Sequence, residues 1–176
     1  MGVNEALERA RGIRLMGFDV DGILTDGTLY LSDSGEETKG FSTLDGLGLK
    51  LLQENGVELA IITGRESRLV ALRAQQLGIR RLHQGIEHKF DIFDALRREL
   101  GLELNQCGYM GDDLPDLGIL SRCGFAATVP QAPMAVRSRV HYVTETPAGD
   151  GAAREVCDLI LQSQGKLDRA IARFLA

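Results

Sequence analysis

Short, nearly continuous apolar runs alternate with helical patterns along most of this 176-residue chain. The runs lack the polar–apolar alternation of a half-exposed sheet, which is typical of parallel strands buried on both faces. Three helical patterns stop at Gly56, Gly78 and Gly101, residues that commonly terminate helices. This order predicts an α/β fold with a doubly wound, Rossmann-like, mostly parallel sheet flanked by helices. The predicted strands cover residues 13–18, 57–63, 107–110, 124–129 and 141–144, with a short one near Leu82.

One segment departs from this alternation, directly after the first predicted strand. Residues 27–41 read GTLYLSDSGEETKGF, in which two β-prone arms flank a turn sequence, and they predict a projecting β-hairpin. The hairpin and one helix use up the interval between Asp21 and Thr63, whereas an independent cap domain needs roughly 50 residues or more. We therefore expect a single domain over residues 1–176 with no cap domain.

Composition excludes several classes of protein. A net charge of −5 and a pI near 5.2 argue against a nucleic-acid partner, because phosphate backbones are bound by basic surfaces. No apolar run reaches membrane-spanning length, and the charged first residues do not resemble a secretory signal. Three widely spaced cysteines, Cys107, Cys123 and Cys157, have no metal-binding spacing and are expected to be buried thiols. We expect a cytoplasmic protein without membrane contact.

Acidic residues gather after the predicted strands, where open α/β sheets bind their ligands. Asp19 and Asp21 follow the first strand, and GDDLPD follows a later one with Asp112, Asp113 and Asp116. Carboxylates that lie this close together repel one another and raise each other's pKa. A divalent cation relieves this repulsion, and a set of oxygen ligands without histidine or cysteine favours Mg²⁺.

The neighbouring residues suit a phosphate group. Mg²⁺ is usually bound by one or two carboxylates together with phosphate oxygens of the substrate. Thr63 and the amide of Gly64 follow the second strand and can donate hydrogen bonds to such oxygens. Lys89 stands at the start of a predicted helix, where its charge adds to the positive end of the helix dipole. The pattern therefore predicts a site that binds a metal ion and a phosphoryl group.

These motifs resemble the four motifs of the haloacid dehalogenase superfamily. DVDG, TGR, an isolated lysine and GDDxxD occur in that order within residues 13–120. The resemblance implies that Asp19 is the nucleophile, which becomes an aspartyl phosphate. It implies that Asp21 protonates the leaving alkoxide and later deprotonates the attacking water.

The resemblance also implies the remaining roles. Mg²⁺ is held by Asp19, the backbone carbonyl of Asp21 and Asp112, while Thr63 and Lys89 bind the phosphate. Residues Asp113 and Asp116 orient water and the lysine, or cap the following helix, and the two roles can coexist.

A closer resemblance covers almost the whole chain. The tract from Asp21 to Phe41, the later DGLGLK and ITGRESRLVALR, and the C-terminal GDGAAREVCDLILQSQGKLD are similar to the family of 3-deoxy-D-manno-octulosonate 8-phosphate phosphatases. That family implies a capless, Mg²⁺-dependent homotetramer in lipopolysaccharide biosynthesis, assembled through the hairpin, with a neighbouring subunit closing each site. It leaves open whether the C-terminal tail covers a neighbour's site or packs on its own domain. It also implies that Arg65 and Arg73 meet the substrate carboxylate, although Arg73 fits a solvated helix face as well.

The segment before the second predicted helix matches the substrate-binding turn of that family. Its residues are Ser42, Thr43, Leu44, Asp45 and Gly46, with Lys50 one turn further on. Asp45 fits a helix N-cap equally well, and Lys50 fits a surface lysine. Leu44 stands where the family often has arginine, and AGDG at 148–151 replaces its GGxG, so the resemblance does not by itself assign the exact sugar.

Three other functions stay open on the residues. A phosphatase for another acidic sugar, such as a nonulosonate 9-phosphate, would use the same chemistry. A signalling receiver domain also combines Mg²⁺, acidic residues, a threonine and a lysine, but the strand ending near Thr63 lacks its phospho-accepting aspartate. A catalytically inactive assembly module would not need Asp19, Asp21 and Lys89 together.

Overall fold

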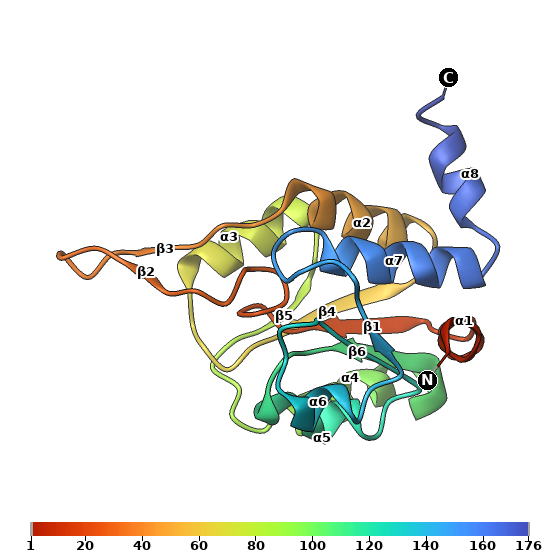
Figure 1. Cartoon of the computed structure of the whole chain (residues 1–176), viewed down its shortest axis with the longest axis horizontal. Helices are drawn as coiled ribbons and strands as arrows, with labels where there is room; N and C mark the ends of the chain where they lie inside the picture. The colour runs from red at the N-terminus through yellow and green to blue at the C-terminus, as the bar shows by residue number, and fades with distance from the viewer. Residues whose placement is uncertain (1, 176) are drawn as a thin grey trace.

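The computed structural model describes residues 2–175 and is built around one parallel sheet (Figure 1). Its strand order is β5-β4-β1-β6-β7-β8, and every neighbouring pair is parallel. With the hairpin set aside, this is the Rossmann order, in which the chain reverses direction beside β1. The predicted fold class is confirmed, with strands one or two residues shorter at some ends. The strands are β1 (Leu15–Phe18), β4 (Glu58–Ile62), β5 (Arg81–His83), β6 (Cys107–Met110), β7 (Phe125–Thr128) and β8 (Tyr142–Val143).

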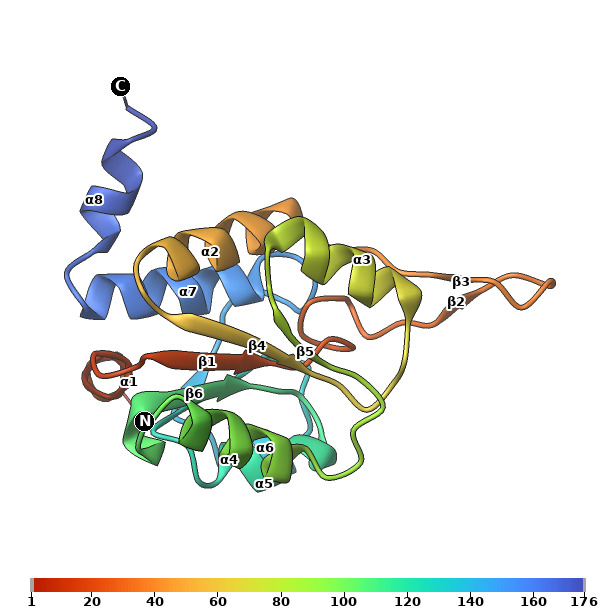
Figure 2. The ribbon, with the colours of Figure 1, turned by 180° about the vertical axis from the view of Figure 1, so that it is seen from behind.

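Helices cover both faces of the sheet (Figures 1 and 2). On one face lie α2 (Thr43–Glu54), α3 (Arg68–Leu77) and α7 (Ala152–Ser163). The other face carries α4 (Lys89–Glu99), α5 (Leu117–Leu120) and α6 (Met134–Arg137). The remaining helices are α1 (Val3–Ala10), at one end of the sheet, and α8 (Leu167–Ala172), which projects from the end of α7.

Glycines end three helices as the sequence predicts. Gly56, Gly78 and Gly101 have φ angles of 89°, 70° and 65° after α2, α3 and α4. In this left-handed region a side chain would be strained, so glycine stops the helix and lets the chain turn toward the next strand.

The predicted hairpin projects far beyond the carboxyl end of the sheet (Figure 1). Its paired part is short, since β2 (Tyr30–Leu31) and β3 (Glu37–Thr38) form two antiparallel residue pairs. Leu29, Tyr30 and Leu31 expose half or more of their surface on this arm. Between β1 and α2, the described chain has room only for a turn and this hairpin, in agreement with the predicted lack of a cap domain. The extent of the domain, residues 1–176, stays a prediction.

The core is arranged around the central strands. All residues of β1, β6 and β7 are buried, as expected of strands covered on both faces. Tyr109 of β6 packs edge-on against Phe93 of α4, with ring centroids 5.9 Å apart. All three cysteines are buried free thiols, as predicted, and burial raises the pKa of Cys107 to about 11. Among residues 2–175, no helix is long and apolar enough to cross a membrane.

Candidate active site

Three carboxylates meet at the carboxyl edge of the sheet. Asp19, Asp112 and Asp116 each place an oxygen within 4.8 Å of the other two. This follows from the topology, because β1 and β6 are adjacent parallel strands whose following loops leave at the same edge. The amide of Asp19 donates to the carbonyl of Met110 at 2.9 Å, which ties the first loop to the neighbouring strand.

Two glycines allow these loops to approach so closely. Gly22 has a φ of 85°, and a Cβ on it would overlap the carboxylate of Asp112. A Cβ on Gly111 would overlap the side chain of Asp116. The glycine of DVDG and that of GDD are therefore required by close packing of one loop on the other.

Lys89 bridges the two loops from the first position of α4. Its ammonium lies 2.8 Å from Oδ2 of Asp19 and 2.7 Å from Oδ1 of Asp116. Burial lowers the pKa of Lys89, but Asp116 and Asp19 outweigh burial and raise it above its usual value. The lysine is therefore a fixed positive charge beside Asp19, where a phosphate oxygen could be bound.

Asp116 is fully occupied by hydrogen bonds. Its Oδ1 accepts from Lys89 and from the hydroxyl of Tyr109, at 2.7 and 3.1 Å. Its Oδ2 accepts from the amides of Asp112 and Asp113, at 3.1 and 3.2 Å. Asp113 itself accepts from the amide of Leu114 at 2.8 Å and caps the short 3₁₀ turn that follows. Asp116 therefore orients Lys89 and shapes the loop, and it has little capacity left for a cation.

The remaining carboxylates carry an excess of negative charge. Burial, and then Asp116, raise the pKa of Asp19 to about 6, although Lys89 opposes them. Burial, and then Asp19 and Asp116, raise the pKa of Asp112 to about 7. A divalent cation between Asp19 and Asp112 would relieve this repulsion, and an all-oxygen donor set suits Mg²⁺. Asp116, whose oxygens already accept four hydrogen bonds, is less suited to bind such a cation than Asp19 and Asp112.

The second predicted motif reaches the same edge from β4. Thr63 is buried at the end of that strand, and its amide donates to the carbonyl of His83 at 2.9 Å. Gly64 and Arg65 follow it and are exposed. One guanidinium nitrogen of Arg65, Nη2, lies 2.7 Å from Oε1 of Glu37 in β3 of the hairpin. Thr63, Gly64 and Arg65 therefore follow β4 at the same edge of the sheet as the acidic cluster, because β4 lies parallel beside β1.

Lys39 is the residue that sequence reasoning missed. Its side chain is only 2% exposed, and its ammonium pairs with Oδ1 of Asp21 and lies 3.4 Å from Oε1 of Glu37. A lysine in a projecting hairpin is expected to be solvated, and its contact with Asp21 joins residues 18 positions apart. Nothing in its immediate neighbourhood in the sequence predicted this contact.

The predicted substrate turn forms the start of α2, and its polar residues bind backbone groups. Ser42 is the N-cap of α2, and its hydroxyl accepts from the amide of Leu44 at 3.2 Å. Asp45 is buried and accepts from the amide of Arg154 at 2.8 Å, at the start of α7. The alternative interpretation of Asp45 as the cap of its own helix was therefore wrong, because it binds the first turn of a different helix.

Arg73 supports this turn from α3. Its Nη2 donates to the carbonyl of Ser42 at 3.0 Å, and its guanidinium stacks 5.9 Å from the ring centre of Phe41. A Cβ on Gly46 would collide with the same guanidinium, so the glycine makes room for it. In this structure Arg73 holds backbone in place, which differs from the solvated helix face considered above.

An open groove of about 620 Å³ lies between the hairpin and the start of α2. Thr43 and Leu44 line it, together with Tyr30 and Asp150, and Leu44 is 53% exposed. Lys50 is exposed further along α2. The groove offers space for a sugar, but its leucine cannot pair with a carboxylate.

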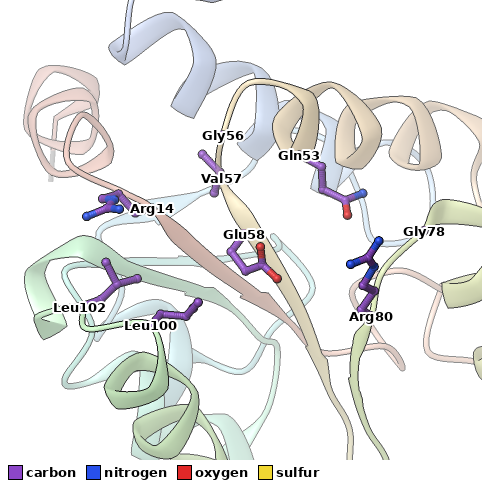
Figure 3. A pocket seen from close by; sticks show the side chains of 9 residues that line it. All are labelled: Arg14, Gln53, Gly56, Val57, Glu58, Gly78, Arg80, Leu100 and Leu102. Atoms are coloured by element: carbon purple, nitrogen blue, oxygen red, sulfur yellow. The ribbon is translucent and has the colours of Figure 1, made fainter.

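A second groove of about 460 Å³ lies at the opposite end of the sheet (Figure 3). Arg14 and Arg80 flank it, Gln53 and Glu58 face it, and Glu58 is paired with Arg81 at 2.9 Å. Arg14, Glu58 and Arg80 directly precede or begin their strands, whereas ligands of open α/β sheets bind beyond the carboxyl ends. The candidate active site is therefore the acidic edge and not this groove.

The fold and the site define the class of this protein. A Rossmann-ordered sheet, a DxD pair after β1 and a lysine that bridges to an acidic loop after β6 make it a hydrolase of the haloacid dehalogenase superfamily. No family model matches the chain. The 3-deoxy-D-manno-octulosonate 8-phosphate phosphatase KdsC of Escherichia coli strain K12 is 42% identical over 166 residues, which are 94% of this chain and 88% of that protein. The chain belongs to the 3-deoxy-D-manno-octulosonate 8-phosphate phosphatase family, which confirms the predicted resemblance.

Solved structures agree with this assignment. The phosphatase of that name from Moraxella catarrhalis, in complex with a magnesium ion, a phosphate ion and a KDO molecule, is 45% identical with a TM-score of 0.96. The match covers 98% of this chain and 99% of that one. The cobalt-bound enzyme from Haemophilus influenzae is 36% identical with a TM-score of 0.88, over 93% of this chain and 99% of its own.

Proposed function

We propose that this protein hydrolyses 3-deoxy-D-manno-octulosonate 8-phosphate to 3-deoxy-D-manno-octulosonate and phosphate, as an Mg²⁺-dependent phosphomonoesterase of lipopolysaccharide biosynthesis. The observation that carries the proposal is the position of Asp19 between Lys89 and Asp112 at the carboxyl edge of the sheet. A nucleophile, a fixed positive charge and a pair of metal-binding carboxylates within one site are what phosphoryl transfer requires.

The residues present divide the reaction into two steps. The carboxylate of Asp19 attacks phosphorus, the bond to the sugar oxygen breaks, and Asp21 gives that oxygen a proton. Asp21 then takes a proton from water, the water attacks the aspartyl phosphate, and phosphate leaves while Asp19 is restored. Thr63 and Lys89 donate to the equatorial phosphate oxygens in both steps. Mg²⁺ held by Asp19, Asp112 and the carbonyl of Asp21 would supply neutralisation of the phosphate charge.

Substrate recognition is assigned mainly to Arg65. It is exposed at the same edge of the sheet as the acidic cluster, and a guanidinium can bind a carboxylate through two parallel hydrogen bonds. Arg73 would act indirectly, because it holds the backbone of Ser42 at the entrance of the groove. Ser42, Thr43, Leu44 and Gly46 would shape that entrance, and Lys50 would contribute charge from further away.

The runner-up substrate is another acidic sugar, such as a nonulosonate 9-phosphate. Leu44 leaves this alternative open, because a leucine in the groove makes no contact with a carboxylate that would select one acidic sugar over another. Rates of phosphate release from the two phosphosugars, measured under the same conditions, distinguish the two proposed substrates. Equal rates on both would contradict the octulosonate assignment and leave the reaction type intact.

We also propose that the protein is a cytoplasmic homotetramer. The exposed apolar side chains of Leu29, Tyr30 and Leu31 on a projecting arm support an assembly surface there. Three buried free thiols, Cys107, Cys123 and Cys157, are compatible with a reducing compartment.

Phosphate release measured with octulosonate 8-phosphate tests the proposed reaction. We expect activity with Mg²⁺, its loss in EDTA, and its recovery when Mg²⁺ is returned. Asp19→Asn should abolish turnover of every phosphomonoester. Asp21→Ala should cripple turnover but retain Mg²⁺ binding, because the carbonyl of residue 21 survives the substitution. An Asp19→Asn variant that still turns over would overturn the mechanism.

A further inference from the structure

Four side chains of alternating charge connect the catalytic loop to the hairpin and then to Arg65. Lys39 pairs with Oδ1 of Asp21 at one end of this row. In the middle, the single oxygen Oε1 of Glu37 lies 3.4 Å from the ammonium of Lys39 and 2.7 Å from Nη2 of Arg65. Because one carboxylate oxygen faces both cations, Glu37 is the point through which the hairpin touches the recognition arginine.

Exposure increases from Lys39 through Glu37 to Arg65, the three side chains that follow Asp21 in this row. The side chain of Lys39 is 2% exposed, that of Glu37 is 19% exposed and that of Arg65 is 44% exposed. Lys39 is anchored inside the protein, and it holds Glu37 at a fixed place on the rim. An exposed arginine has many rotamers, and a fixed carboxylate beside it removes much of that freedom before any ligand arrives.

The way Arg65 is held leaves most of its hydrogen-bonding capacity for a ligand. Among the described residues its one ion-pair partner is Glu37, reached through Nη2. A guanidinium has five N–H donors in a planar fork, so donors on Nε and Nη1 are available to a second carboxylate. A rigid fork that is already oriented binds a carboxylate more tightly than a mobile one.

We propose that Glu37 is a positioning residue for substrate recognition, holding Arg65 by one nitrogen so that the rest of its guanidinium meets the carboxylate of an acidic phosphosugar. This role rests on the proposed function, since it assumes that the substrate carries a carboxylate as well as a phosphate. Glu37 touches neither the substrate nor the reacting atoms, and it acts through Arg65.

Selectivity between two substrates is the measurement that tests this role. Octulosonate 8-phosphate carries a carboxylate, whereas p-nitrophenyl phosphate presents only the phosphate. We expect Glu37→Gln to narrow the preference for the acidic substrate, measured as the ratio of the two kcat/KM values, by about tenfold through KM. Glu36→Gln, a matched change at the exposed neighbouring residue, should leave that ratio unchanged.

A double-mutant cycle separates action through Arg65 from other effects. Arg65→Ala should narrow the preference at least as much as Glu37→Gln, and adding Glu37→Gln to it should change nothing further. A Glu37→Gln variant that loses turnover equally on both substrates would overturn the role, because its effect would then pass through Lys39 to Asp21. An effect that persists in the Arg65→Ala background, or no effect at all, would overturn it as well.

Failure of this role is distinguishable from failure of the proposed function. A wild-type protein that hydrolyses p-nitrophenyl phosphate but no carboxylated phosphosugar would overturn both. A wild-type protein with the expected preference, unaltered in Glu37→Gln, would overturn the role of Glu37 alone. The thermal unfolding temperature of each variant should match that of the wild type within a few degrees. A larger drop in that temperature, together with equal losses of kcat/KM on both substrates, would show that Glu37 is structural and would overturn the role.

Discussion

Residues of the same type perform different tasks in this site because their neighbours differ. Asp112 and Asp116 belong to one short loop, yet Asp116 accepts four hydrogen bonds while Asp112 keeps a raised pKa of about 7. The negative charge of Asp116 is compensated within the protein, whereas that of Asp112 is not. Uncompensated charge is a feature of functional sites, where a ligand supplies the missing partner.

Asp112→Asn should stabilise the metal-free protein at neutral and alkaline pH. The pKa of Asp112 is raised from 3.8 to about 7 in the folded protein. Its ionisation therefore lowers the free energy of unfolding progressively as pH rises between these two values, and the full loss is present above about pH 7. Removing the charge should raise the free energy of unfolding by about 1 kcal/mol at pH 8, after allowance for solvent screening.

Thermal unfolding in EDTA at pH 4 and pH 8 measures this effect. The difference between variant and wild type should be present at pH 8 and small at pH 4. Saturating Mg²⁺ should stabilise the wild type more than the variant. A variant that is less stable than the wild type at pH 8 in EDTA would contradict the prediction.

Lys39→Met should lower turnover on every phosphomonoester. The substitution removes the buried partner of Asp21, whose carboxylate is then free to leave its catalytic position. We expect kcat to fall by roughly tenfold, a part of the 10²–10⁴-fold that general acid–base catalysis typically contributes. Steady-state kinetics on p-nitrophenyl phosphate measure it, and Lys39→Arg should recover part of the loss. Undiminished kcat in a folded Lys39→Met protein would show that Asp21 needs no such partner.

At the scale of elements, helix ends are held by residues from other helices. Asp45 lies in the first turn of α2 but accepts from the amide of Arg154 in the first turn of α7. Burial raises the pKa of Asp45, and hydrogen bonds from the backbone of Arg154 and its neighbours oppose that rise. The contact fixes α7 beside α2 on one face of the sheet (Figure 1), so this part of the predicted substrate turn has a structural use.

Asp45→Ala should therefore reduce stability more than it changes chemistry. Loss of an acceptor at the start of α7 should lower the free energy of unfolding by about 1–2 kcal/mol. Denaturant unfolding measures this loss, with Asp33→Ala at the exposed hairpin turn as the matched control. Turnover of p-nitrophenyl phosphate by the folded variant should stay within about threefold of the wild type, because Asp45 lies outside the cluster of Asp19 and Asp112. A stable variant with greatly reduced turnover would instead place Asp45 in the chemistry.

At the scale of the whole molecule, the parallel sheet is what assembles the site. Loops after β1, β4 and β6 are far apart in the chain, but these strands are neighbours and all point the same way. The hairpin extends from the same edge, so the part of the protein proposed for assembly is also the part that carries Lys39 and Glu37 (Figure 1). Assembly and recognition are thus connected through one short arm.

Leu31→Glu should prevent tetramer formation. Leu31 is 64% exposed on the hairpin, and a charge in a buried interface there would be strongly unfavourable. Light scattering after size-exclusion chromatography should give a smaller assembly than the wild type. Met134→Glu, at a similarly exposed residue of α6, should leave the mass unchanged. A tetrameric Leu31→Glu protein would place the interface elsewhere.

Strands, helix ends and the acidic motifs were predictable because each depends on nearby residues. Continuous apolar runs such as 107–110 are sufficient to indicate buried strands, and glycines such as Gly78 stop helices for a local steric reason. Asp19, Asp112 and Lys89 were predictable as a group because parallel topology requires strand ends to meet at one edge.

Contacts between side chains that are distant in the chain depended on the folded structure. Lys39 reaches Asp21 because the chain that returns from the hairpin passes the catalytic loop, and Asp45 binds α7 because two helices pack side by side. A lysine or an aspartate at these positions would be solvated if the hairpin and the helices packed differently. Pairing energy depends steeply on separation and burial, and only the tertiary structure sets both quantities.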